Sequence, residues 1–144
     1  MLSVTCQVAL KAVTYIASKY EKRNKKSGIK EIAMQIEESE HTIGKVLQKL
    51  VALKIISSTK GPNGGFFISK EQHQHPIILI VKAVEGQDFF DNCGLGLGMC
   101  SDTHPCPIHE EFKPVREAFK EFSLHKKIGD LYPDLNDGKT YLVS

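Results

Sequence analysis

No stretch of this 144-residue sequence is long and apolar enough to suggest a membrane span. The longest purely apolar run extends only from Ile77 to Val81, whereas a spanning helix needs roughly 20 such residues. The first residues carry no basic flank, no long apolar stretch and no small-residue cleavage site, which together would mark a signal peptide. We therefore expect a cytoplasmic protein that is neither secreted nor bound to a membrane.

Recognisable catalytic arrangements are also missing. The sequence shows no carboxylate pair and no nucleophile–base arrangement that would support an enzyme. The glycine-rich stretch from Lys60 to Gly65 is not a phosphate-binding loop, because residues that favour β-structure follow it and a helix is required there. A small metal-dependent enzyme therefore has no support in the sequence, and we expect a protein that is not an enzyme.

Cysteine is scarce, with four residues in the chain. Disulfides are rare in cytosolic proteins, so metal binding or thiol chemistry is the better default for these cysteines. Cys6 lies in the first helical segment and is expected to be a small packed residue of the core. The other three cysteines lie together in the second half of the chain.

Charge is almost balanced overall at +2, but it is unevenly distributed. Residues 1–70 hold 12 Lys and Arg against 5 Asp and Glu, a net charge of +7. Residues 71–144 hold 7 against 12, a net charge of −5. A basic half followed by an acidic half suggests a module that binds a polyanion, joined to a regulatory or assembly module.

Three segments of the first half have the apolar spacing of amphipathic helices. The first runs from Ser3 to about Tyr20 and the second from Ile29 to Ile36. Ser39 is a typical N-cap for the third helix. The apolar stripe of this third helix consists of Ile43, Val46, Leu47, Leu50 and Leu53.

A β-hairpin is predicted directly after these helices. Two short β-prone runs, 55–59 and 66–69, flank a turn that is dense in glycine. Three helices followed by a hairpin is the order of a winged helix-turn-helix. The predicted fold class is thus mainly α with a small β-hairpin, and we place a winged helix-turn-helix DNA-binding domain at residues 1–75.

The second half, residues 76–144, is predicted to hold a sensor loop and a dimerisation helix. A short helix from Pro76 to Val84 is followed by a long irregular loop over residues 87–107, and loops of this length are usually functional. From Ile108 the apolar residues follow the alternating spacing of four and three that two packed helices use. Pro114 falls inside this pattern, so the helix either begins near it or bends there.

In the winged helix-turn-helix, the third helix would enter the major groove and the hairpin would lie against the backbone or in the minor groove. The outward residues of the third helix are Glu40, His41, Thr42, Lys45 and Lys49. The hairpin candidates for DNA contact are Lys60, Gly61, Pro62, Asn63, Gly64 and Gly65. The alternative is that these lysines only solvate a helix face.

Four candidate metal ligands lie within 17 residues of the loop: Cys93, Cys100, Cys106 and His109. Thiolate and imidazole groups suit Zn²⁺ or an iron–sulphur cluster. Zinc sites favour closer cysteine pairs, so the wider spacings here favour a larger polynuclear centre. Three free cysteines remain the alternative, although exposed thiols in such a loop would oxidise readily.

Three segments carry a resemblance to a known family. Val8 to Val13 looks like the family's opening helix, Ser39 to Leu53 is similar to its recognition helix, and Ser57 to Phe66 looks like its wing, which is the most specific of the three. The sequence resembles the Rrf-two family of small dimeric winged-helix regulators, of the IscR/NsrR type, over nearly the whole chain.

The resemblance implies a homodimer built on the C-terminal helix and bound to a pseudo-palindromic operator in double-stranded DNA. It also implies that the three loop cysteines hold an iron–sulphur cluster, with 2Fe-2S favoured and 4Fe-4S as the alternative. Where other branches have an acidic ligand on the first helix, this chain has Gln7, so His109 is favoured as the fourth ligand. Gly44 stands at a base-reading position, which implies an operator of different sequence.

These inferences together predict a transcription regulator that senses redox state, iron or nitric oxide through the cluster. The alternative is the same DNA-binding regulator without a cluster, using zinc or a thiol switch among the same cysteines.

Overall fold

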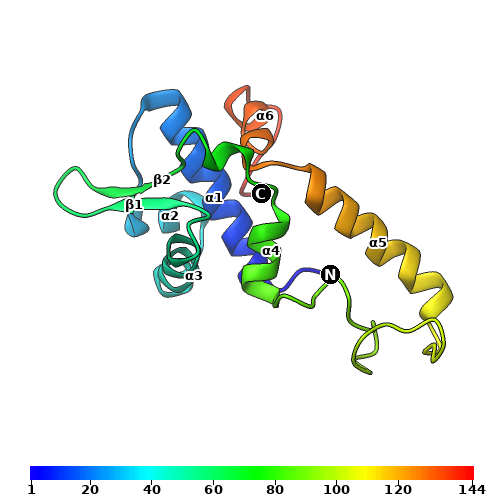
Figure 1. Cartoon of the computed structure of the whole chain (residues 1–144). Helices are drawn as coiled ribbons and strands as arrows, with labels where there is room; N and C mark the ends of the chain where they lie inside the picture. Colours follow the sequence, from blue (N-terminus) through cyan, green and yellow to red (C-terminus); the bar gives the residue numbers. More distant parts are fainter.

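One long helix, α1, runs through the middle of the computed structural model, which describes all 144 residues (Figure 1). Helices dominate the structure, with one two-stranded antiparallel hairpin. In chain order the elements are α1 (Val4–Arg23), α2 (Ile29–Ile36), α3 (Glu40–Ala52), β1 (Ser57–Thr59), β2 (Gly65–Phe67), the 3₁₀ turn η1 (Gln72–Gln74), α4 (Ile78–Glu85), α5 (His109–His125), the 3₁₀ turn η2 (Ile128–Asp130) and α6 (Pro133–Asn136). None of the helices is long and apolar enough to cross a membrane.

Local capping sets the bounds of the first three helices. The Ser3 hydroxyl accepts a hydrogen bond from the Cys6 amide at 3.1 Å, and α1 ends where Asn24 turns into the left-handed region. Ser39 caps α3 as predicted, and its hydroxyl accepts from the Thr42 amide at 3.4 Å. The predicted bounds of α2 and the predicted N-cap of α3 are therefore confirmed.

The three helices share one core. Their buried residues include Ile16 of α1, Ile32 of α2 and Leu47 of α3, all without exposed surface. Gly44 of α3 is also buried, and a Cβ atom at this position would lie 3.5 Å from Ile29. The expectation that Gly44 stands at a base-reading position is therefore wrong, because this position of α3 faces α2.

The hairpin is joined to the rest of the fold by a third extended segment. Ser57 pairs with Phe67 and Thr59 with Gly65. On the other edge, Ser27 and Phe66 exchange two backbone hydrogen bonds of 3.0 and 2.8 Å. This short bridge, just before α2, fixes the direction in which the hairpin leaves the body of the molecule, and sequence periodicity gave no signal for it.

The second half returns to the core after a long excursion. Helix α4 packs on α1, and the loop of residues 86–108 leads to α5, which extends away from the body on the side opposite the hairpin (Figure 1). Pro114 lies inside α5, which begins at His109. After α5, Ile128 and Tyr132 pack into the same core as α1 to α3.

We predict that Gly65→Ala destabilises the protein by about 1–3 kcal/mol, because Gly65 has φ 138° and an added Cβ would lie 2.9 Å from the Ser27 carbonyl oxygen. Urea unfolding followed by circular dichroism measures this loss. Gly28→Ala is the matched control, with φ −86° and open space around it, and should cost about 1 kcal/mol or less. Equal losses in the two variants would contradict the assignment.

Candidate DNA-binding surface and cysteine cluster

The outward face of α3 carries side chains that can contact base edges. His41, Lys45 and Lys49 are exposed, as is Glu40 in the first turn, while Thr42 is half-buried beside the cap. Gln48 is exposed on the same face but was not among the predicted residues. Its position three residues after Lys45 could have revealed it, and a glutamine amide can pair with adenine.

The tip of the hairpin is exposed, whereas its second half is structural. Lys60, Gly61, Pro62 and Asn63 are exposed at the turn. Gly64 and Gly65 are half-buried, and an added Cβ at Gly64 would lie 2.3 Å from the Thr59 carbonyl oxygen. The first four residues are thus available for a DNA contact, and the last two allow the strands to close.

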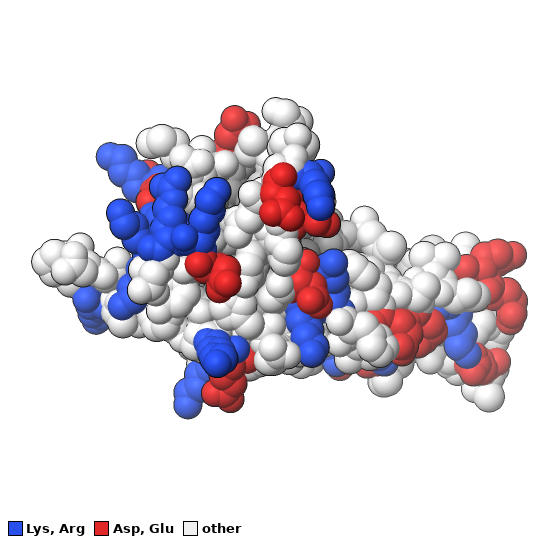
Figure 2. Space-filling view, turned by 90° about the horizontal axis from the view of Figure 1, so that it is seen from above, with Lys and Arg blue, Asp and Glu red and all other residues white.

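Basic side chains are concentrated at the hairpin end of the molecule (Figure 2). The last turn of α1 carries Lys22 and Arg23. Lys26 follows, with its ammonium group 2.9 Å from the Thr59 hydroxyl and 4.9 Å from the centre of the Phe67 ring. Acidic side chains gather at the opposite end, where α5 begins (Figure 2). The charge asymmetry of the sequence is therefore also an asymmetry in space.

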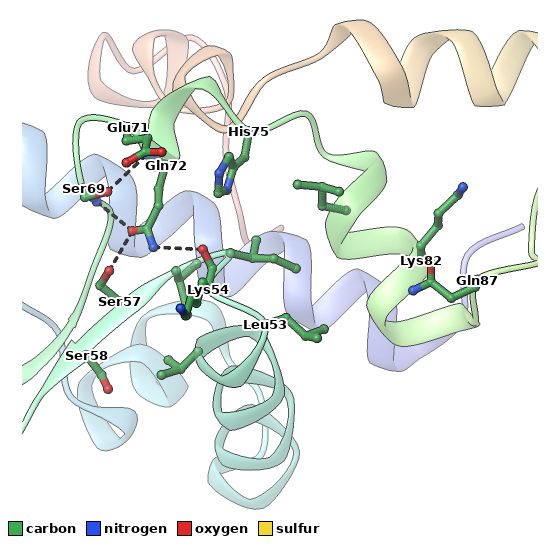
Figure 3. A pocket seen from close by; sticks show the side chains of 14 residues that line it. Leu53, Lys54, Ser57, Ser58, Ser69, Glu71, Gln72, His75, Lys82 and Gln87 are labelled. Carbon is green, nitrogen blue, oxygen red and sulfur yellow. Dashed lines mark hydrogen bonds between the residues drawn. The ribbon is translucent and has the colours of Figure 1, made fainter.

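An open cleft of about 820 Å³ lies between the end of α3, β1 and α4 (Figure 3). Gln72 lies at its wall. The Gln72 side-chain oxygen accepts from the Ser57 hydroxyl and the Ser69 amide, both at 2.9 Å, and its nitrogen donates to the Lys54 carbonyl at 3.1 Å. This buried amide ties the base of the hairpin to the end of α3, so we assign it a structural role.

The cysteine loop is folded by its own backbone. Cys93 donates its amide to the Gly98 carbonyl at 2.7 Å, and Cys100 donates its amide to Asp91 at 2.8 Å. Gly94 lies so close to α5 that an added Cβ would be 2.8 Å from the Phe112 ring. These contacts bring Cys93 and Cys100 to the start of α5, beside Cys106.

Cys93 and Cys106 interact as a pair. The amides of Leu97 and Leu95 donate to the Cys93 sulphur and lower the pKa of its thiol. Burial raises the pKa of Cys106, and its hydrogen bond to Cys93 raises it further. Of the two thiols, Cys93 therefore loses its proton more readily than Cys106.

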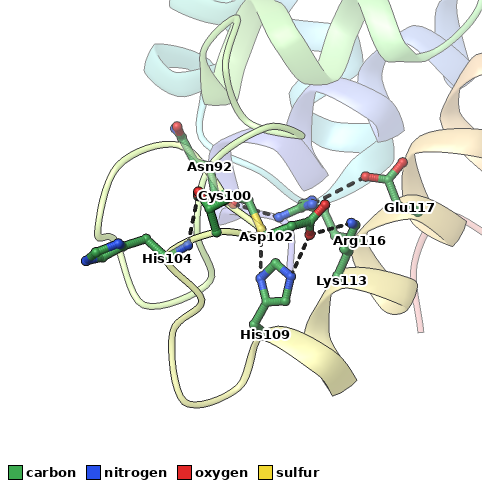
Figure 4. Close-up of polar contacts among 10 residues, drawn as sticks. Asn92, Cys100, Asp102, His104, His109, Lys113, Arg116 and Glu117 are labelled. Carbon is green, nitrogen blue, oxygen red and sulfur yellow. Dashed lines mark hydrogen bonds and ion pairs between the residues drawn. The ribbon is translucent and has the colours of Figure 1, made fainter.

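Cys100 and His109 form a second pair (Figure 4). The Cys100 sulphur lies 3.3 Å from Nδ1 of His109, which is buried. On the other side of the ring, Nε2 lies 2.8 Å from an Asp102 carboxylate oxygen, and Lys113 donates to that same oxygen at 2.7 Å. The Lys113 and His109 hydrogen bonds hold the pKa of Asp102 below its usual range.

The chemistry of these residues suits a metal centre, although their side chains form two pairs and do not converge on one point. No group of three His, Cys, Asp or Glu side chains converges closely enough to hold a metal ion. Two features nevertheless fit a thiolate-bound metal: a cysteine sulphur that accepts backbone amides, and a histidine whose far nitrogen is held by a carboxylate. The structure thus brings together Cys93, Cys100, Cys106 and His109, and adds Asp102 beside them.

Comparison with known proteins identifies the family. The family model of Rrf2, described as an iron-dependent transcriptional regulator, matches residues 2–134. The chain belongs to the Rrf2 family. The resemblance inferred from the sequence is confirmed, and so is the expected winged-helix fold with its hairpin.

Individual Rrf2 relatives and fold neighbours agree with this. An Aquifex aeolicus (strain VF5) protein described as an HTH-type transcriptional regulator is 27% identical over 133 residues, which cover 91% of this chain and 90% of that protein. CymR, the global cysteine regulator of B. subtilis, superposes with a TM-score of 0.74 at 18% identity, covering 97% of this chain and 98% of CymR. IscR of T. potens superposes with a TM-score of 0.73 at 16% identity, covering 97% and 91%.

The family places this chain among DNA-binding transcription regulators and not among enzymes, as the sequence predicted. The two structural neighbours share its fold.

We predict that, in the metal-free protein, iodoacetamide modifies Cys93 at a lower pH than Cys106. The thiolate is the reactive form, and the pKa of Cys93 is lowered while that of Cys106 is raised. Cys6 is the internal control, because burial and the nearby Glu85 raise its pKa to about 12 and it should react only after unfolding. Peptide mass spectrometry over a pH series reads each rate, and faster reaction of Cys106 would contradict this order.

Proposed function

We propose that this Rrf2 protein is a homodimeric cytoplasmic regulator of the IscR/NsrR type, which binds a pseudo-palindromic operator and senses redox state, iron or nitric oxide through an iron–sulphur cluster. The observation that carries the proposal is that two neighbouring pairs, Cys93–Cys106 and Cys100–His109, lie near the start of α5. Three thiolates and one imidazole can bind either a 2Fe-2S or a 4Fe-4S cluster. We favour the 2Fe-2S cluster, with 4Fe-4S as the alternative.

For DNA contact, we propose α3 in the major groove and the hairpin tip beside it. The proposed residues are Glu40, His41, Thr42, Lys45, Lys49, Lys60, Gly61, Pro62, Asn63, Gly64 and Gly65, of which the last two act by closing the hairpin. Lys45 and Lys49 are exposed one turn apart and can reach a guanine edge or a phosphate. Residues 1–75 remain our proposed DNA-binding domain, with residues 76–144 as the sensor and dimerisation part.

The proposed dimer is formed along α5. Val115 and Phe122 are about half exposed on this helix, at 49% and 50%, which leaves an apolar seam open to a second copy. Phe119, between them, packs inward against Phe90 with ring centres 5.3 Å apart. The same helix can therefore bind a partner on one side and remain fixed to its own core on the other.

When bound, a cluster would supply a centre whose charge changes with redox state. The chain's residues transmit this change by position: Cys100 and His109 connect the loop to α5, and α5 carries the dimer seam. A regulatory effect requires that the two states of the site favour different spacings of the two α3 helices. The half-sites of an operator lie about one DNA turn apart, so small changes of spacing lose base contacts.

The alternative proposal keeps the DNA-binding part and replaces the cluster with zinc or a thiol switch. The Cys93–Cys106 pair supports it, because two adjacent thiols, one of which has a lowered pKa, are suited to disulfide formation once an oxidant removes two electrons and two protons. Metal analysis distinguishes these alternatives from the cluster.

We predict that Lys45→Ala weakens binding to the preferred operator by about 1–3 kcal/mol and relaxes the base preference at one position in each half-site. Lys60→Gln should weaken binding to all sequences alike and reduce the slope of log affinity against log salt by about 1. Fluorescence anisotropy with operator and scrambled duplexes at several salt concentrations measures both effects. Lys139→Gln, in the C-terminal tail, is the control, and an equal loss in it would contradict the assigned surface.

Protein isolated without air should show visible absorbance together with bound iron and sulphide. We predict that Cys100→Ala abolishes the absorbance, because it removes a thiolate ligand, and that Cys6→Ala retains it, because Cys6 is buried in the core. Absorption spectra with iron and sulphide analysis provide the measurement. A colourless wild-type protein with one equivalent of zinc would refute the cluster and support the zinc alternative. Colour retained in Cys100→Ala would refute the proposed ligand set.

A further inference from the structure

Arg116 of α5 is a buried cation with incomplete pairing. Its exposed fraction is 7%, and Nε is buried without a hydrogen-bond partner. One terminal nitrogen donates to the Asn92 carbonyl at 3.2 Å. The other lies 3.3 Å from the carboxylate of Glu117, which is 48% exposed and therefore screened by water. A buried charge is costly unless it is well paired, so this guanidinium requires a further negative partner.

That partner is the cysteine loop. The guanidinium lies beside the Cys100 side chain, and the nearby sulphur is the main cause that raises the pKa of Arg116. The Cys100 amide is bonded to Asp91, next to the Asn92 whose carbonyl the arginine also holds. One side chain of α5 is therefore bonded to the turn that carries Cys93 and Cys100 (Figure 4).

We propose that Arg116 is a positioning residue of the sensor site: it anchors the turn that carries Cys93 and Cys100 to α5, through the Asn92 carbonyl, and supplies the buried positive charge that compensates the thiolate-bound group. This inference rests on the proposed iron–sulphur function. It assigns to Arg116 a share in setting the reduction potential of the site, in addition to the effect of the ligands themselves.

The sign of the effect follows from charge. Adding one electron makes the site more negative, and a buried cation nearby stabilises the added charge more than water would. Removing the positive charge therefore makes reduction less favourable. Other cations lie at the periphery: Lys113 is 41% exposed and already bonded to Asp102, and Lys120 is bonded to Asp91.

The test is a reductive titration of the loaded protein, in which dithionite donates the electron and a redox dye reports the potential. In Arg116→Gln we expect the equilibrium constant for one-electron reduction to fall at least tenfold, which corresponds to a potential about 59 mV lower. Arg116→Lys, which keeps the charge, should recover most of this loss. Lys120→Gln is the matched control, because Lys120 also joins α5 to the loop, at Asp91 Oδ1 and 3.2 Å, but not at a cysteine.

An unchanged potential in Arg116→Gln, or an equal fall in Lys120→Gln, would overturn the proposal while leaving the cluster itself intact. Should Arg116→Gln fold but fail to hold the group, judged by circular dichroism and iron content, recovery in Arg116→Lys supports the positioning role and failure in both overturns the charge role. A wild-type protein without iron and sulphide would overturn the proposed function and this inference together.

Discussion

Burial of α1 is the constraint on which the other elements depend. Nine of its residues are buried, and they face in several directions, so the helix has neighbours around most of its circumference. On one side α1 packs against α2 and α3, and on another it packs against α4. A helix that is apolar on so much of its surface is stable only inside a layer of other elements. The orientation of α3 and the position of α4 are thus both fixed by α1.

The same helix places the sensor part relative to the DNA-binding part. Cys6 of α1 is buried in a small cluster with Val81 of α4 and Phe90 of the loop, and Phe119 of α5 packs against this cluster. Tightly packed aromatic and aliphatic side chains transmit displacement, because the interior has little free volume. A shift of α5 must therefore be accommodated by α4 or by α1, and α1 carries α3 on its other face.

Much of this arrangement was predictable from the sequence because the buried residues of a helix recur at regular spacing. A helix shows its buried face every three or four residues, and Ser39 marks the start of α3 by the chemistry of capping. The glycine-dense turn marked the hairpin in the same way. The joining of Ser27 to Phe66 was not predictable, because a single backbone bridge between distant segments leaves no periodic trace. Gly44 was misassigned for a related reason. The spacing along α3 gives the face on which Gly44 lies, but that face is buried only because α2 packs against it.

At the cysteine site, the candidate ligands were predictable from the sequence and the residues that support them were not. Cysteine spacing alone drew attention to Cys93, Cys100 and Cys106, because few residue types bind soft metals. Asp102 could be noted from the sequence only as a further ligand candidate in the loop, and Arg116 could not be chosen from the other charged residues, since the role of each depends on what it touches. The Asp102 carboxylate fixes the orientation of the histidine ring, and the buried guanidinium supplies a positive electric field beside the cysteine turn. Because these supports stand on α5 or on the loop that precedes it, a change of charge at the cysteines acts directly on the helix that we propose to join the two copies.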